Sequence, residues 1–411
     1  MLRAIRPALL CLAVALPALA VRVAGTQLPP LVALVMFGAG VVAASFVLAW
    51  AAEAAEMDIS GGLAIALLAL IAVLPEYAVD LYFAHTAGSN PAYVSYAAAN
   101  MTGSNRLLLG LGWSVVVLLA LLVARRRTGR TFRALVLDGG YRRELGFLAI
   151  AAVVAFTIPL SCQIHLVLGL GLLAFFGYYL WRVAMADHDH EPELVGPAAR
   201  IGSLPRARRR TVVTAMFVGA ALTILACAQP FADSLIASGE ALGVDRFLLV
   251  QWLAPLASEA PELIVAVLFA LRGNGPAAIG LLISAKVNQW TLLIGSLPVA
   301  YVLGGGSAAL PLDGRQTEEV LLTAAQTLLG VAALLALRFP RWAAWTLLGL
   351  FVVQFAIPGQ HGRYLLSALY VVLAIGALIH HRRAILPTLA APFRRTVAAE
   401  PVRERELVDA A

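Results

Sequence analysis

The chain has 411 residues, of which 61% are hydrophobic and 13% charged, and its mean hydropathy is +0.87. A soluble domain is nearer half apolar and a quarter charged, so this composition excludes an ordinary soluble protein and predicts a chain embedded in the lipid bilayer. The net charge of +7 does not indicate nucleic-acid binding, because the arginines gather at the ends of apolar runs, where they set membrane topology.

Twelve apolar runs approach the length of about 20 residues that a bilayer-crossing helix needs. The first follows Arg3 and Arg6 and resembles a signal peptide, but the topology favours a retained span. The runs lie at 5–22, 30–54, 62–85, 95–123, 145–161, 164–185, 211–237, 246–271, 277–303, 318–338, 341–357 and 363–381. The sequence therefore predicts an all-α polytopic membrane protein with about 12 spans.

Three arginine-rich segments fall on the same side of a twelve-span chain. They are residues 125–143, 200–210 and 382–405, whereas the loops on the opposite side carry at most one arginine each. Because cytoplasmic loops carry the excess of Lys and Arg, this pattern places both termini in the cytoplasm of a cell (inner) membrane protein.

The longest polar connection, residues 186–210, divides the chain into halves. It contains DHDHEPE, where His188 and His190 beside acids are possible metal ligands. A solvated linker is the favoured interpretation, because nothing there fixes ligand geometry. The three cysteines, Cys11, Cys162 and Cys227, fall in apolar runs without metal-site spacing and are expected to be packed thiols.

The two halves resemble each other. Asp58 precedes Glu76 by 18 residues, and Asp245 precedes Glu262 by 17. Each glutamate follows a proline inside a span, and a span that begins with small and polar residues comes next, at 97–112 and 280–295.

The repeat unit spans five helices, at 30–185 and 211–357, with 1–29 and the basic 358–411 as flanking segments. Because the unit has an odd number of spans, the second copy enters the membrane from the opposite side. Such an inverted repeat is a common transporter architecture.

A proline inside a span removes a backbone hydrogen bond, so the freed carbonyl and the adjacent carboxylate can bind a cation. A single Pro-Glu pair could equally well be a proline kink without a binding function. Two pairs at matching positions, Pro75-Glu76 and Pro261-Glu262, predict a broken helix with a functional acid in each repeat.

Oxygen-bearing side chains accompany these acids. Asn100 and Ser104 share a helix face, and Asn105 adds an oxygen on the adjacent face. Amide and hydroxyl oxygens suit hard cations such as sodium and calcium. Asp80 and Glu259 each lie within about one turn of a motif glutamate and are further candidates for the same cavity.

These residues resemble the calcium/cation antiporter superfamily, the sodium/calcium exchangers and their relatives. In that family each inverted repeat carries GTSxPE and then GNxxGSNxxN. LPE (74–76) with NMTGSN (100–105) resembles the first repeat, and APE (260–262) with SAKVNQ (284–289) resembles the second. The resemblance covers roughly residues 30–357. It implies cation exchange by alternating access, with the ion bound by Glu76, Glu262 and oxygens of Asn100, Ser104, Asn105, Ser284 and Asn288.

The chain departs from the family pattern in two ways. Neither copy has GTS before its acid, and Lys286, the only lysine in the protein, falls at or near the Asn of the second GSN. Its ammonium could replace a sodium ion with its own charge, carry a proton, or form a structural pair with a glutamate. An ammonium there argues against calcium transport coupled to three sodium ions.

The predicted function is a secondary active cation antiporter that exchanges Ca²⁺ or Na⁺ against Na⁺ or H⁺. The family favours calcium, whereas Lys286 favours a monovalent or proton-coupled cycle. The alternative is a degenerate, non-transporting exchanger homologue that serves as a membrane sensor or assembly protein. An enzyme is not expected, because no nucleophile–base constellation or HExxH occurs. No cofactor is expected either, since the cations are cargo, and the sequence indicates no oligomeric state.

Overall fold

The computed structural model describes residues 2–55, 57–58, 74–185, 194, 196–357 and 359–394. It consists of two compact units. The first comprises Met1–Asn100, Gly177–Pro261 and Leu303–Gly305, and the second comprises Met101–Phe176, Glu262–Val302 and Gly306–Ala411. Each unit takes helices from both halves of the sequence, so neither corresponds to one sequence repeat.

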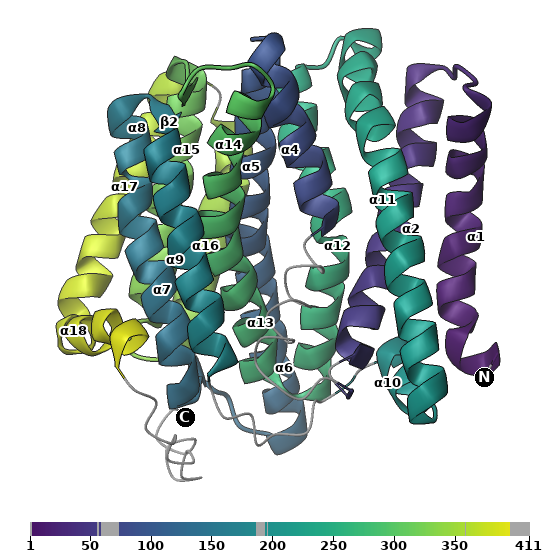
Figure 1. Cartoon of the computed structure of the whole chain (residues 1–411). Coiled ribbons are helices and arrows are strands. Elements are labelled where there is room, and N and C mark those ends of the chain that lie inside the picture. The colour runs from purple at the N-terminus through teal and green to yellow at the C-terminus, as the bar shows by residue number, and fades with distance from the viewer. Residues whose placement is uncertain are drawn as a thin grey trace. The chain divides into compact units, whose positions relative to one another are not determined.

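In the first unit, α1, α2 and α11 lie side by side (Figure 1). Small residues allow this close packing: a Cβ on Gly38 would lie 3.0 Å from Phe231 Cε2, and one on Gly40 would lie 3.3 Å from Cys227 Sγ. The elements of this unit are α1 (Leu2–Ala24), α2 (Pro30–Ala55), α4 (Leu74–Ser89), the start of α5 (Tyr93–Arg106), the end of α9 (Leu166–Ala184), α10 (Gly196–Gly202), α11 (Arg206–Leu242) and the first part of α12 (Arg246–Arg272).

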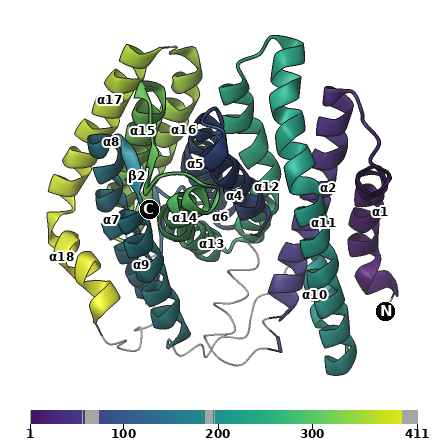
Figure 2. The same ribbon diagram turned by 45° about the horizontal axis from the view of Figure 1, so that its top comes forward.

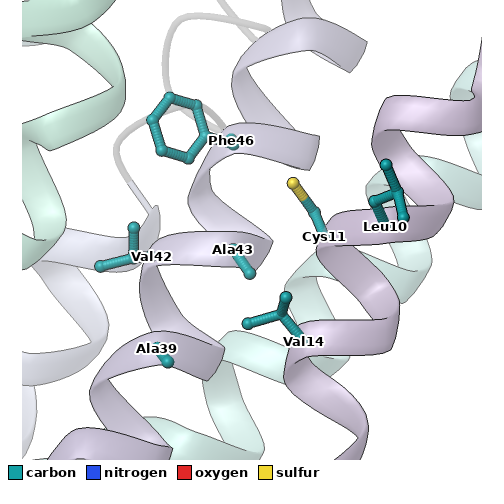
Figure 3. A pocket seen from close by; sticks show the side chains of 7 residues that line it. All are labelled: Leu10, Cys11, Val14, Ala39, Val42, Ala43 and Phe46. Carbon is teal, nitrogen blue, oxygen red and sulfur yellow. The ribbon is translucent and has the colours of Figure 1, made fainter.

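An apolar cavity of about 390 Å³ opens between α1 and α2 (Figure 3). Its lining residues are Leu10, Cys11, Val14, Ala39, Val42, Ala43 and Phe46. None of these side chains is charged, so the cavity suits hydrocarbon and not a cation.

In the second unit, α15 packs along α17 and also contacts α7 (Figures 1 and 2). Two short antiparallel strand pairs join distant parts of the chain, with Ala134 opposite Pro340 and Gln163 opposite Pro311. Besides parts of α5, α9 and α12, the elements are η1 (Leu107–Trp113), α6 (Ser114–Thr128), β1 (Ala134–Val136), η2 (Gly139–Tyr141), α7 (Arg142–Ala155), α8 (Thr157–Ser161), β2 (Gln163–His165), α13 (Gly275–Asn288), η3 (Gln289–Leu293), α14 (Ile294–Leu303), β3 (Ala309–Pro311), α15 (Gly314–Leu334), β4 (Arg338–Pro340), α16 (Arg341–Ala356), α17 (Gln360–His380), α18 (Arg382–Ala390) and η4 (Ala391–Phe393).

Both helices that carry the predicted oxygen ligands continue into π-helical segments. η1 follows α5 directly, and η3 follows α13. Such segments are rare and occur often at functional sites. In η1 a Cβ on Gly110 would lie 2.5 Å from Phe351 Cδ2 and 2.6 Å from Gln326 Nε2, so only glycine fits at this position.

Within the described residues, ten helices are long and apolar enough to cross a membrane, which confirms the predicted polytopic helical class. They match ten of the twelve predicted runs. The run at 341–357 is the shorter helix α16 of 16 residues. The run at 62–85 is described only from Leu74 onward, as part of α4.

Two expectations need correction. Helix α12 is continuous through Pro255 and Pro261, so the predicted break before Glu262 is wrong. Within the predicted linker, 186–210, the structure describes helix α10 and the start of α11. His188 and His190 lie outside the described residues. Cys162 is exposed, not packed; it follows α8 with its backbone in the left-handed region (φ 52°).

Candidate cation-binding site

The acidic part of the first motif lies in the first unit, on α4. Glu76 is 5% exposed, and Asp80, one turn further along, is completely buried. Asn100 Nδ2 donates to Asp80 Oδ1 at 2.8 Å, which joins α5 to α4. Asp80 Oδ2 is buried and has no hydrogen-bond partner in the described part of the chain. Burying a carboxylate without compensation costs free energy, so a positive charge is favoured near Glu76 and Asp80.

The second motif lies on α12. Glu259, in the first unit, is 2% exposed, and Glu262, in the second unit, is half-buried. Although α12 is continuous, Pro261 has no N–H to donate to the carbonyl of Ala257. That carbonyl is the backbone oxygen that the Pro-Glu design was expected to supply.

Lys286 is completely buried in the second unit, where its ammonium binds Asn105 twice. Nζ donates to the Asn105 backbone oxygen at 2.6 Å and to Oδ1 at 2.7 Å. The side-chain amide is oriented for this contact, because Nδ2 donates to Met101 O at 2.9 Å. Nζ also lies 5.6 Å from the centroid of the Trp290 ring, within the range of a cation–π interaction. The predicted ligand Asn105 thus serves a cation that belongs to the protein itself.

The helix ends define how the two motifs correspond. Helices α5 and α13 each have 14 residues, and each leads directly into a π-helical segment. Counted back from those ends, Lys286 occupies the position of Ser104, one residue before Asn105. The lysine is therefore near the position of the family's asparagine, as predicted, but not at it.

The remaining predicted ligands differ in exposure. Ser104 is completely buried, and Asn288 is 7% exposed. Ser284 lies one turn before Asn288 and is half-buried; its Oγ donates to Glu144 Oε2 at 3.2 Å. Glu144, on α7, was not predicted, because beside Arg142 and Arg143 it looks like an ordinary span-end charge. Across the described ranges, no group of three or more His, Cys, Asp and Glu side chains could hold a metal ion.

A buried ion-pair cluster, also unpredicted, lies next to Asn105 in the sequence. Arg106 NH2 pairs with Glu319 Oε2 at 2.6 Å, and Arg363 NH1 pairs with Glu319 Oε1 at 3.0 Å. Arg106 NH1 also donates to Gln354 Oε1 at 3.1 Å. The one sequence signal for it was an arginine inside the predicted run 95–123.

The aspartates that helped to align the repeats have structural roles. Asp58 accepts from Arg209 Nε at 2.6 Å and from Arg209 NH2 at 2.9 Å. The hydrogen bond from Arg209, together with the nearby charge of Arg210, holds the pKa of Asp58 below its usual value despite partial desolvation. Asp245 Oδ1 accepts from Phe247 N at 2.9 Å, at the start of α12.

The family described as "Sodium/calcium exchanger protein" matches residues 29–185 and 212–358. The crystal structure of the H⁺/Ca²⁺ exchanger CAX is 42% identical, with a TM-score of 0.88, and the match covers 95% of this chain and 98% of that one. No curated protein matches the chain.

Two more distant structures show the fold alone. Native YfkE is 16% identical, with a TM-score of 0.60, over 90% of this chain and 98% of its own. The sodium-calcium exchanger NCX_Mj, soaked with Na⁺ and Sr²⁺, is 18% identical, with a TM-score of 0.51, over 80% of this chain and 97% of its own.

These matches confirm the predicted fold class of two inverted five-helix repeats with one flanking helix at each end. The family is one of transporters, and nothing in the matches favours a non-transporting homologue. The chain belongs to the sodium/calcium exchanger protein family and is a secondary active cation antiporter of a membrane.

Proposed function

We propose that this protein exchanges Ca²⁺ for H⁺ by alternating access. The observation that carries the proposal is the ammonium of Lys286 on both oxygens of Asn105, at 2.6 and 2.7 Å. A sodium ion bound to the same oxygens would lie within a few ångströms of a fixed positive charge, in a site of low dielectric constant. Lys286 therefore disfavours sodium as the coupling ion, and protons take that role. Similarity to the H⁺/Ca²⁺ exchanger CAX supports the same assignment.

Glu76 and Glu262 are proposed to bind the calcium ion, because two carboxylates neutralise one divalent cation and calcium prefers oxygen ligands. Asn100, Ser104, Ser284 and Asn288 then supply neutral oxygens. When calcium leaves, protons neutralise the two carboxylates, since unpaired charges are costly within the bilayer. The same two acids thereby couple the two fluxes.

Asp80 and Glu259 are proposed to strengthen the negative potential at the site, as both are buried within about one turn of a motif glutamate. Lys286 offsets part of this negative charge. The balance favours a single divalent cation over several monovalent ions.

The repeats are proposed to be residues 30–185 and 211–357, with 1–29 and 358–411 as flanking segments and 186–210 as a cytoplasmic linker. The two stretches that match the family support this division. The arginine-rich segments favour a cell (inner) membrane with both termini in the cytoplasm. The exchanger is proposed to work without a resident cofactor.

The test is a flux measurement with the full chain in proteoliposomes that contain a calcium dye and a pH dye, in sodium-free buffer. An acidic interior should drive calcium uptake and simultaneous proton efflux. Glu262→Gln should abolish both fluxes, whereas Glu318→Gln, which changes a buried acid on α15, should leave them intact. Calcium uptake that requires a sodium gradient and moves no protons would contradict proton coupling.

A further inference from the structure

The buried cluster formed by Arg106, Glu319, Arg363 and Gln354 lies within the second unit and has no place in the exchange cycle proposed above. It joins four helices, α5, α15, α17 and α16. The paired side chains of Arg106 and Glu319 are 1% and 2% exposed, and that of Arg363 is 12% exposed. Two arginines and one glutamate thus meet where apolar packing would be the ordinary choice.

Stability alone does not account for this cluster. Removing charges from water is expensive, and buried ion pairs can often be replaced by apolar side chains without loss of stability. A guanidinium does provide fixed direction, because its planar fork holds several acceptors at once. Arg106 uses this property: NH2 pairs with Glu319, NH1 donates to Gln354, and Nε is directed to Thr102 O at 3.4 Å. Its side chain is held in one orientation.

That orientation bears directly on the Lys286 contact. The Asn105 carbonyl, which accepts from Lys286 Nζ, belongs to the peptide unit that links Asn105 to Arg106. A peptide unit is planar, so fixing Arg106 restricts the direction of this carbonyl. Arg106 is also the residue from which the π-helical segment η1 begins, where the backbone leaves ordinary α-helical hydrogen bonding.

We propose that Glu319 is a positioning residue that acts through Arg106 to hold the Asn105 carbonyl on Lys286. Arg363 on α17 holds Glu319 from the other side, so the C-terminal flanking span takes part in shaping the cation site. The effect on transport rests on the proposed calcium–proton exchange, whereas the effect on the Lys286 contact does not.

The test uses the fact that Lys286 is the only lysine in the chain. The full-length protein in detergent is exposed to an amine-reactive ester, and peptide mass spectrometry separates labelling at Lys286 from labelling at the N-terminal amine. Glu319→Gln should raise the labelling rate at Lys286 at least about tenfold, equivalent to about 1.4 kcal/mol of easier opening. The matched control is Glu318→Gln, the adjacent and similarly buried acid, which should change the rate less than about twofold.

In Glu319→Asp, which keeps the charge, Lys286 should be labelled more slowly than in Glu319→Gln. If Glu319→Gln does not fold, Gln354→Leu removes one contact of Arg106 and should raise the rate by a smaller factor. A wild-type labelling rate in the folded variants, or an equal rise in Glu318→Gln, would overturn the proposal.

In proteoliposomes Glu319→Gln should raise KM for Ca²⁺ more than it lowers the maximal rate. No flux in the wild type would contradict the exchange function and leave the labelling result standing.

Discussion

The contact between Lys286 and Asn105 predicts an unequal effect of removing its two partners. Asn105→Leu deletes the Oδ1 acceptor at 2.7 Å and keeps the backbone oxygen at 2.6 Å. A hydrogen bond to a charged group contributes about 1.5–3 kcal/mol, so the free energy of unfolding should fall by about 2 kcal/mol.

Lys286→Met should cost less. It leaves the neutral Asn105 amide oxygen without its donor, at a cost of about 1–2 kcal/mol. It also removes the penalty for burying an ammonium, which is several kcal/mol in proteins. The two effects oppose each other, so we expect a net loss of about 1 kcal/mol or less. In the double variant the two losses should not add, with a coupling energy of about 1–2 kcal/mol.

The measurement is equilibrium unfolding in detergent by denaturant titration. Thermal melting is a poor choice, because a chain of this length shifts its Tm by only about 1 °C per kcal/mol. Clearly greater destabilisation by Lys286→Met than by Asn105→Leu would contradict this predicted order. Losses that add within about 0.5 kcal/mol in the double variant would contradict the predicted coupling, since the residues would then be energetically independent.

Three further predictions follow from the same structure. Lys286→Asn should let sodium compete for the site, so that sodium raises KM for Ca²⁺ in proteoliposomes although it has little effect on the wild type. Gly110→Ala should lower the free energy of unfolding by about 1–3 kcal/mol through overpacking, whereas Gly376→Ala, where a Cβ meets nothing within 4 Å, should be neutral or slightly stabilising. Asp58→Asn should cost about 1 kcal/mol at pH 7, since exposed partners such as Arg210 contribute little. Because the folded-state pKa of Asp58 is lowered, this difference from the wild type should disappear as the pH falls from about 4 through that pKa.

The positions of the spans and of the Pro-Glu motifs could be predicted from the sequence because the bilayer constrains both. Hydrocarbon thickness sets the length of each apolar run, and an acid within a span is rare enough to mark a site. Glu76 and Glu262 were predicted as site residues in this way, and their role in transport stays a prediction. The predicted break at Pro261 was wrong for a related reason: a proline removes one donor, and neighbouring groups in a membrane helix can compensate for it.

The partners of buried polar groups could not be predicted, since they depend on how distant helices pack. The contact between the Lys286 ammonium and Asn105, 181 positions away in the chain, was not predicted. Arg106 gave a local signal, an arginine inside an apolar run, but the sequence does not show that Glu319 lies beside it. The sequence shows which residues carry a charge, but it does not show which of them contact each other.

Under the proposed function, helices α5 and α13 explain how an inverted repeat acquires a preference among cations. Helices α5 and α13 each have 14 residues and each continue into a π-helical segment, of seven residues in η1 and five in η3. Positions near the two helix ends can therefore be matched. At one such position the first repeat has the hydroxyl of Ser104, and the second has the ammonium of Lys286. That ammonium binds the amide of the first repeat, so one substitution adds a charge and also occupies an oxygen ligand. Ion selectivity can therefore change through the count of charges and free oxygens while the backbone architecture stays the same.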